Sequence, residues 1–140
     1  GGASAWRFYD DVEPVLKELR RYGFKLGIVS NWDTRLRRIA EELGLLRLVD
    51  DLVISAEAGV RKPDRRIFDL ALSRLGVQPH EALHIGDLVE DDVAGARAAG
   101  ITPVLLQREV SSSVIERGDF RIIRRLGELL QDLTGNRRGP

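Results

Sequence analysis

Cysteine and methionine are both absent from the 140 residues of this chain. Without cysteine the chain can form neither disulfides nor thiolate sites, and a cytoplasmic location is favoured because disulfides are typical of oxidising compartments. Long apolar runs are absent as well, so the sequence predicts no membrane-spanning helix and no signal peptide. The sequence begins with GGASAW rather than with Met, from which we expect that it is not a complete translation product.

An excess of charge of one sign is also missing, because 22 Lys and Arg residues balance 22 Asp and Glu residues. Nucleic acids and anionic membranes select basic surfaces, so we expect neither as a partner. The composition, 43% hydrophobic and 31% charged, is that of a soluble globular domain. A chain of this length buries ~70% of its unfolded surface. We therefore expect one domain over residues 1–140, with flexible ends at 1–8 and 134–140.

Two kinds of apolar spacing alternate along the chain. Helical spacing predicts helices at 12–19, 36–43, 68–75, 92–99 and 122–133. Short runs rich in β-branched residues predict strands at 25–30, 51–55, 82–87 and 102–107, and the stretch 108–121 is expected to be a loop. The alternation predicts an α/β fold, a doubly wound parallel sheet of about four strands with helices on both faces.

Single residues indicate where these helices begin and end. Asp64 is a predicted N-cap, and a glycine follows each of four predicted helices: Gly23, Gly44, Gly76 and Gly100.

Polar residues follow three of the predicted strands. They are Ser30 and Asn31 after the first, Lys62 beyond the second, and Asp87 with Asp91 and Asp92 after the third. Ligands of doubly wound folds bind at the carboxyl ends of the strands, so we expect these residues to meet at one edge of the sheet.

Each group has a purely structural alternative. Residues of the SNWDT stretch are ordinary helix caps as well as candidates for a phosphate site at a helix N-terminus. Lys62 is either a solvated loop lysine or a cation aimed at a phosphoryl group. Acids that start a helix stabilise its dipole, which accounts for Asp91 and Asp92. Asp87 lies at a strand end, where a carboxylate is a typical ligand of Mg²⁺.

The histidines and the tryptophan after the first strand carry weaker signals. His84 lies within a strand and is predicted to be a core imidazole, whereas His80 is expected to be solvated. Trp32 either flanks the phosphate site or covers the sheet edge. Neither a P-loop nor a dinucleotide-binding glycine motif is present.

Four stretches, in this order, resemble the haloacid dehalogenase-like hydrolase superfamily in its phosphatase branch. They are FYDDVEPVLKELRRYGFKLGIVSN, GVRKPDRRIF, HIGDLVEDDVAGARAAG and VLLQRE, and they extend from Phe8 to Glu109. The resemblance implies a Rossmann-like sheet, Mg²⁺ as cofactor, and phosphate-ester hydrolysis through an aspartyl-phosphate on a small phosphorylated metabolite.

The same resemblance implies roles for individual residues. Ser30 would hydrogen-bond the phosphoryl oxygens, helped by Asn31. Lys62 would steady the phosphoryl charge and the nucleophile. The implied metal ligands are Asp87 and, as the second acid, Asp91 or Asp92.

The chain departs from the family at its first motif, a strand ending in D-x-D that carries the nucleophile. No D-x-D occurs in the sequence, and Asp10 and Asp11 lie where the family chain leads into its first helix after the cap. We therefore expect the carboxyl-terminal part of a core domain, without nucleophile and cap, that is inactive alone. Whether it is a fragment, a split subunit or a degenerate homologue stays open.

Two other functions are compatible with these residues. One is a non-catalytic binding or assembly module of the same fold. The other is a receiver-like signalling domain, which would place Lys after the acids, whereas Lys62 precedes them.

The resemblance implies that the family's first-motif strand runs between the strands at 25–30 and 82–87, so its loss would open a gap of about 9.6 Å at the ~4.8 Å spacing of strands. Direct pairing of the flanking strands, folding back of Ala3 to Tyr9, or a strand or cover from a second chain, as in a homodimer, would each satisfy the unpaired backbone.

Overall fold

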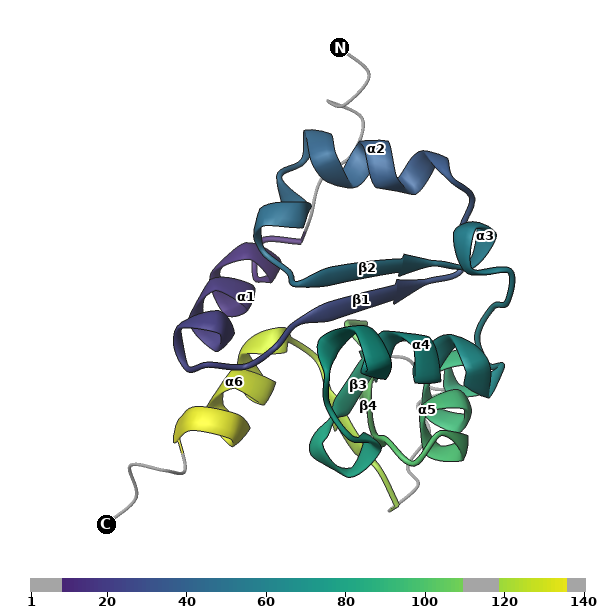
Figure 1. The fold of residues 1–140 in the computed structure, drawn as a ribbon. Coiled ribbons are helices and arrows are strands. Elements are labelled where there is room, and N and C mark those ends of the chain that lie inside the picture. The colour runs from purple at the N-terminus through teal and green to yellow at the C-terminus, as the bar shows by residue number, and fades with distance from the viewer. Residues whose placement is uncertain (1–8, 110–118, 136–140) are drawn as a thin grey trace.

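The computed structural model describes residues 9–109 and 119–135, in which helices and strands alternate as predicted (Figure 1). The strands are β1 (Gly27–Ser30), β2 (Asp51–Ile54), β3 (Leu83–Gly86), β4 (Thr102–Leu106) and β5 (Arg121–Ile123). The helices are α1 (Val12–Arg21), α2 (Arg35–Glu42), α3 (Ser55–Ala58), α4 (Arg65–Leu75), α5 (Gly95–Ala98) and α6 (Leu126–Thr134). Short 3-10 turns form η2 (Leu45–Arg47) and η3 (Pro79–Glu81), and the π-helical η4 (Val89–Ala94) runs directly into α5.

The prediction for the carboxyl-terminal part needs correction. Ile122 and Ile123 were expected in the last helix, but they lie in β5, which pairs in parallel with β4. The described residues thus form five strands rather than about four. An apolar pair fits both periodicities, and pairing with β4 decides the outcome because it leaves Ile123 0% exposed.

The last helix therefore begins at Leu126, later than predicted. Thr134, expected to start a flexible end, is buried in α6 and donates a hydrogen bond from its hydroxyl to the carbonyl of Leu130 (2.6 Å). The predicted flexible residues 1–8 and 136–140 lie outside the described residues, as do residues 110–118 of the loop predicted at 108–121. The last residue of that predicted loop, Arg121, lies in β5 instead.

The strands form two separate parallel sheets. One has the order β1-β2 and the other β3-β4-β5. β1 and β3 share no ladder, so direct pairing of these strands is wrong as a remedy for the missing strand. The remedy in which Ala3 to Tyr9 folds back falls almost wholly outside the described residues, and dimerisation stays a prediction.

Helix α4 covers one face of the β1–β2 sheet and reaches the other sheet at β3. Its residue Phe68 belongs to a buried cluster with Val53 of β2 and Ala96 of α5, against which Val29 of β1 packs. The Phe68 ring also meets the His84 ring of β3 edge to face, with centroids 5.0 Å apart. The α4 layer therefore joins the two-stranded sheet to the three-stranded one.

Helices α1 and α6 cover the opposite face, and the two are in contact (Figure 1). Leu16 of α1 and Ile28 of β1 pack against a second cluster, whose buried members come from α2, η2, the segment after η2 and β2. Leu129 of α6 belongs to a third cluster, against which Ile85 of β3 packs. Both faces of β1 and of β3 are thus covered by helices.

The strands differ in how well they are buried. Most residues of β2 and of β4 are buried, whereas every residue of β1 and of β3 is partly or fully exposed. Among the described strands, β1, β2, β3 and β5 each have a ladder on one edge, and β4 has a ladder on both.

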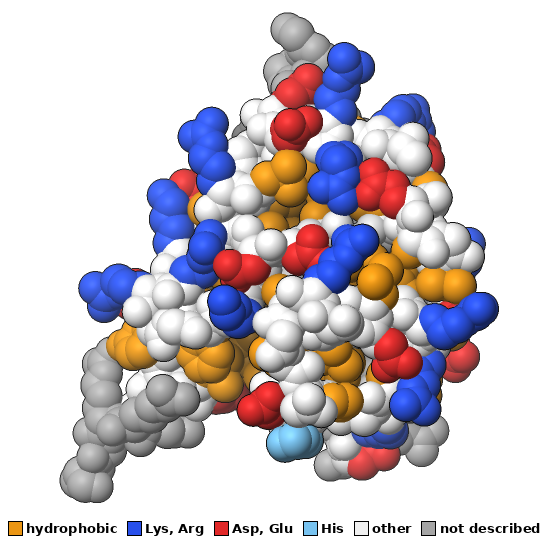
Figure 2. Space-filling view, viewed as in Figure 1, with side chains coloured by type: hydrophobic (Ala, Val, Ile, Leu, Met, Phe, Trp, Pro, Cys, Tyr) orange, Lys and Arg blue, Asp and Glu red, His pale blue; other side chains and the backbone are white. Residues whose placement is uncertain are grey.

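No described helix is long and apolar enough to cross a membrane. On the face drawn in Figure 2, basic and acidic side chains are interspersed. Among the large apolar side chains, Tyr9, Tyr22, Leu83 (36%) and Leu88 (53%) are exposed, and the last two lie on and just beyond β3.

Candidate functional site

Asn31, the first residue after β1, fixes the backbone of Lys62. Its Oδ1 accepts a hydrogen bond from the Lys62 N–H (2.8 Å), and its Nδ2 donates to the Lys62 carbonyl (3.0 Å). The loop beyond β2 therefore reaches the carboxyl end of β1, as the strand-end argument predicted. The side-chain amide of Asn31 orients Lys62, and its contribution to phosphate binding stays a prediction.

The ammonium of Lys62 lies against a buried carboxylate. Lys62 Nζ donates to Oδ1 of Asp92 at 2.6 Å, and the side chains are 13% and 2% exposed. His84 Nε2 lies 2.8 Å from the same oxygen, and because a carboxylate only accepts, this nitrogen carries the hydrogen. Asp92 thus joins Lys62 to β3 of the other sheet.

Burial raises the pKa of Asp92, but hydrogen bonds from His84 and Lys62, together with their charge, outweigh it and lower the pKa to about 2. Asp92 is therefore ionised at neutral pH. A charge this deeply buried is compatible with folding only when paired and hydrogen-bonded, and both conditions hold here.

Gly86, the last residue of β3, leaves room for this carboxylate. A Cβ at Gly86 would clash with the Asp92 side chain. The second carboxylate oxygen, Oδ2, accepts a hydrogen bond from the N–H of Leu88 (3.1 Å). Both Asp92 oxygens are satisfied, so its position is fixed from both sides.

The other two acids of the predicted metal set lie differently. Asp87 is exposed, and Asp91 is half-buried with Asn31 Nδ2 at 3.4 Å from its Oδ2. No group of three His, Cys, Asp or Glu side chains within residues 9–109 and 119–135 could hold a metal ion. With Asp92 engaged by Lys62 and His84, the described residues do not by themselves form a metal site.

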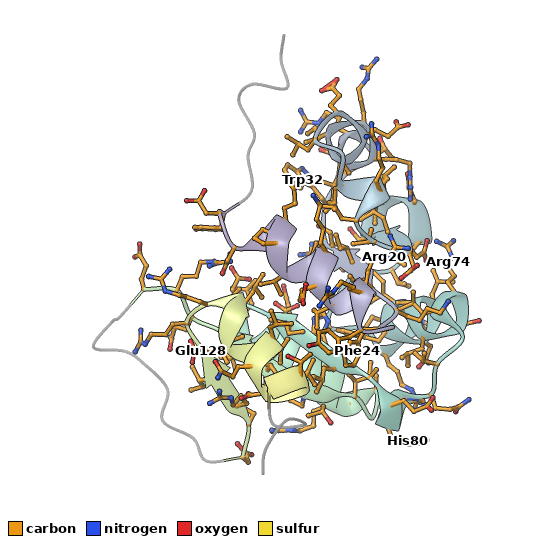
Figure 3. The ribbon with its side chains drawn as sticks, turned by 90° about the vertical axis from the view of Figure 1, so that its left-hand side faces the viewer. Arg20, Phe24, Trp32, Arg74, His80 and Glu128 are labelled. Atoms are coloured by element: carbon orange, nitrogen blue, oxygen red, sulfur yellow. The ribbon has the colours of Figure 1, made fainter. Side chains whose placement is uncertain are left out.

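Ser30 and Trp32 complete the end of β1. Ser30 is half-buried at the last position of β1, and its role in phosphate binding stays a prediction. The N–H of Trp32 donates to Ser55 Oγ (2.9 Å), and the Ser55 hydroxyl donates to the Trp32 carbonyl (3.0 Å). Ser55, which the sequence did not single out, therefore fixes the loop after β1. His80 is exposed in η3, far from Trp32 (Figure 3).

Asp11 is committed to a structural contact. Arg108, two residues beyond β4, donates to both Asp11 oxygens (3.1 and 3.0 Å), and the N–H of Leu126 donates to Oδ2 (2.9 Å). The bonds from Arg108 lower the pKa of Asp11 despite the opposing effect of burial. The guanidinium also lies 4.0 Å from the centroid of the Tyr9 ring. The sequence did not single out Arg108. It is the first residue after the predicted fourth strand, so the strand-end rule applied to the first three strands would also have identified it.

Comparison with known proteins identifies the family that the sequence motifs resemble. The family model for haloacid dehalogenase-like hydrolases matches residues 1–100. A glyceraldehyde 3-phosphate phosphatase from Methanopyrus kandleri is 39% identical over 117 residues, which cover 79% of this chain and 48% of the relative. A phosphoserine phosphatase from Thermus thermophilus is 41% identical, over 71% of this chain and 41% of the relative. The chain thus spans about half the length of the curated relatives it matches.

Solved structures give the same assignment. A HAD phosphatase from Thermococcus onnurineus superimposes with a TM-score of 0.81 at 34% identity, over 92% of this chain and 59% of that chain. A magnesium-bound putative HAD-hydrolase from Bacillus subtilis gives a TM-score of 0.80 at 25% identity, over 90% of this chain and 56% of that chain. The sheet, the Lys62–Asp92 pair at its carboxyl edge and the matched family model lead to one conclusion: this chain belongs to the haloacid dehalogenase-like hydrolase family.

Proposed function

We propose that this chain is the carboxyl-terminal part of the catalytic core of a phosphohydrolase, which hydrolyses a phosphate ester through an aspartyl-phosphate intermediate. The observation that supports this best is the position of Lys62. Its backbone is fixed by Asn31 and its ammonium by the buried Asp92, at the carboxyl ends of the strands. A positive charge held in place there neutralises the charge of a transferred phosphoryl group without reorganisation.

The chain supplies binding groups for the phosphoryl group rather than the nucleophile. The ammonium of Lys62 has three hydrogens, of which Asp92 accepts one, so the others remain for a phosphoryl oxygen or a nucleophilic carboxylate. The Ser30 hydroxyl is the second proposed binding group. The proposed requirement for Mg²⁺ rests on Asp87 and Asp91, and it needs ligands from outside the described residues.

The nucleophile is the part that this chain does not provide. Asp11 is held by Arg108 and the Leu126 N–H, and the sequence contains no D-x-D. Covalent catalysis depends on an activated nucleophile, so we expect no turnover by the chain alone. The names of two relatives, which act on glyceraldehyde 3-phosphate and phosphoserine, favour a small phosphorylated metabolite as the substrate of the whole enzyme.

The test is to complete the core and then remove Lys62. Residues 9–140 fused behind the amino-terminal half of the Methanopyrus kandleri phosphatase should hydrolyse a chromogenic phosphate ester with Mg²⁺, whereas the chain alone should not exceed a protein-free blank. Lys62→Met should lower kcat of the fusion by on the order of 10²-fold or more, by the size of single electrostatic contributions. The matched control is Lys17→Met, which removes an exposed lysine of α1 and should leave kcat unchanged.

Two results would contradict the proposal. One is equal activity of the fusion with and without Lys62. The other is turnover by the isolated chain that disappears in Asp10→Asn, which would show that it carries its own nucleophile.

A second candidate function is a non-catalytic binding or assembly module. It is favoured by the absence of D-x-D and by the engagement of Asp11 in the fold. This alternative predicts that the isolated chain binds inorganic phosphate and that the fusion, although folded, never turns over.

A further inference from the structure

We propose that Ser55 is a positioning residue of the phosphoryl-binding site, which holds the loop after β1 so that Asn31 orients Lys62. Its hydroxyl acts through Trp32, the residue that follows Asn31 in the chain. The chemical purpose of this arrangement rests on the proposed function, whereas the coupling between Ser55 and Lys62 can be tested without turnover.

Ser55 lies at the carboxyl end of the two-stranded sheet, as the residue after β2 and the first residue of α3 (Figure 1). Ser30 and Ile54 form the last pair of the parallel ladder between β1 and β2. The position of the residues that follow Ser30 is therefore set by contacts beyond this ladder.

Trp32 uses both hydrogen-bonding functions of the Ser55 hydroxyl. The oxygen of Ser55 accepts from the Trp32 N–H (2.9 Å), and its hydroxyl donates to the Trp32 carbonyl (3.0 Å). The same carbonyl accepts from the N–H of Ala56 (3.2 Å). A serine at the start of a helix is ordinarily explained as a helix cap. This hydroxyl instead reaches a residue 23 positions earlier, so it is committed to the loop after β1.

Helix α3 gives Ser55 a fixed base. Glu57 of α3 lies 2.8 Å from the guanidinium of Arg37 in α2, and Arg37 also donates to the carbonyl of Leu52 in β2 (3.0 Å). These contacts hold α3 against α2 and β2 without the Ser55 hydroxyl. Removal of this hydroxyl should therefore loosen the loop rather than displace α3.

The loop transmits the position of Trp32 to Lys62 through a single peptide unit. The Trp32 N–H belongs to the planar unit that joins Asn31 to Trp32, so its bond to Ser55 fixes the orientation of that unit. The side chain of Asn31 then meets both the N–H and the carbonyl of Lys62, at 2.8 and 3.0 Å. Hydrogen bonds weaken steeply when they are misaligned, so this double contact requires a well-placed Asn31.

Loss of the Ser55 hydroxyl would leave the Trp32 N–H without this acceptor, while the Trp32 carbonyl would keep its bond from Ala56. The peptide unit after Asn31 would then rotate more freely. The ammonium of Lys62 would still lie against Asp92, but its backbone would be held less firmly.

The first test is amide hydrogen exchange of the 140-residue chain, followed by NMR. Ser55→Ala should speed exchange of the Lys62 N–H by about tenfold, the effect of one lost hydrogen bond. Ser55→Thr, which keeps the hydroxyl, should restore the native rate. The matched control is Ser73→Ala, which changes an exposed serine of α4. The amides of Val104 and Leu105 in β4 are the internal reference and should not change.

The second test measures the same coupling by kinetics in the completed fusion with Mg²⁺ and a chromogenic phosphate ester. Ser55→Ala should lower kcat on the order of tenfold with little change in KM, because a misplaced Lys62 stabilises the transition state less well. In an Asn31→Ala background the same substitution should lower kcat by less than about twofold, since the group that Ser55 places has been removed.

Unchanged exchange at Lys62 in Ser55→Ala would overturn the inference. Equal acceleration at Val104 and Leu105 would overturn it as well, because it would show general destabilisation. A tenfold loss of kcat that is the same with and without Asn31 would also count against it. Exchange needs no turnover, so this inference and the proposed function fail separately: the latter fails if the fusion is insensitive to Lys62→Met.

Discussion

Removing the charge of Asp92 should destabilise the fold, because this buried carboxylate is paired with the ammonium of Lys62. The pKa of this carboxyl is about 2 in the folded chain against an ordinary 3.8. At about 1.36 kcal/mol per pKa unit, this difference contributes roughly 2 kcal/mol to the free energy of unfolding at neutral pH. Loss of one partner of a buried ion pair costs about 3–5 kcal/mol, because it leaves the other charge uncompensated. Asp92→Asn should therefore lower the free energy of unfolding by roughly 2–5 kcal/mol.

The stabilisation by Asp92 should decrease as the pH is lowered. Because the folded pKa is depressed, the contribution of Asp92 is fully present above pH 3.8 and is lost as the pH falls through about 2. The difference between the native chain and Asp92→Asn should therefore be constant near neutral pH and shrink by about half near pH 3.

Urea unfolding followed by circular dichroism measures both quantities. The matched control is Glu90→Gln, an exposed acid of the same helix, whose loss should cost no more than the ~0.3–1 kcal/mol of a helix-dipole interaction. A cost of Asp92→Asn below about 0.5 kcal/mol, the range of ordinary surface substitutions, would refute the assignment of Asp92 as the paired, buried charge. So would a cost that does not change with pH.

Gly86→Ala should reproduce much of the Asp92→Asn loss, about 1–3 kcal/mol from overpacking, whereas Gly127→Ala, where a Cβ meets nothing, should not destabilise the chain in urea unfolding. Asp11→Ala should cost roughly 1–3 kcal/mol by loss of its charged hydrogen bonds and should speed amide exchange at Leu126; unchanged exchange at Leu126 would contradict its capping by Asp11. In calorimetry of Mg²⁺ with the completed fusion, Asp87→Asn should weaken binding more than Asp92→Asn, because Asp92 is engaged by Lys62; equal losses would count against Asp87 as the main ligand.

Both ends of α4 were predicted correctly because they depend only on the conformation and hydrogen bonds of a few neighbouring residues. Asp64 caps α4 by accepting a hydrogen bond from the N–H of Arg66, as predicted. Gly76, predicted to stop the same helix, has a φ of 70°, a left-handed conformation that side chains with a Cβ rarely adopt. The central strands were found because continuous apolar runs of this length are typical of parallel sheets covered on both faces.

The site could be predicted in part. The rule that ligands bind at the carboxyl ends of strands predicted that Asn31, Lys62 and the acids lie together, and contacts of Asn31 with Lys62 and Asp91, and of Lys62 with Asp92, are present. The sequence did not predict which of the acids is buried against Lys62 and which remains exposed. Spacing along the chain put Asp87 at the strand end, but it is the closeness of Gly86 to η4 that buries Asp92 and leaves Asp87 exposed.

The sequence by itself determined the order of the first four strands and of the longer helices, the class of fold, the family and several of the residues at the carboxyl edge, because each depends on local propensity or on motifs contiguous along the chain. Tertiary structure alone decided which periodicity the pair Ile122 and Ile123 follows, which acid receives Lys62, and that β1 and β3 stay apart. These outcomes depend on contacts between residues far apart in sequence. Among the described residues β1 and β3 share no ladder, and the two sheets are joined instead by the packing of α4, whose Phe68 lies against Val53 of β2 and His84 of β3.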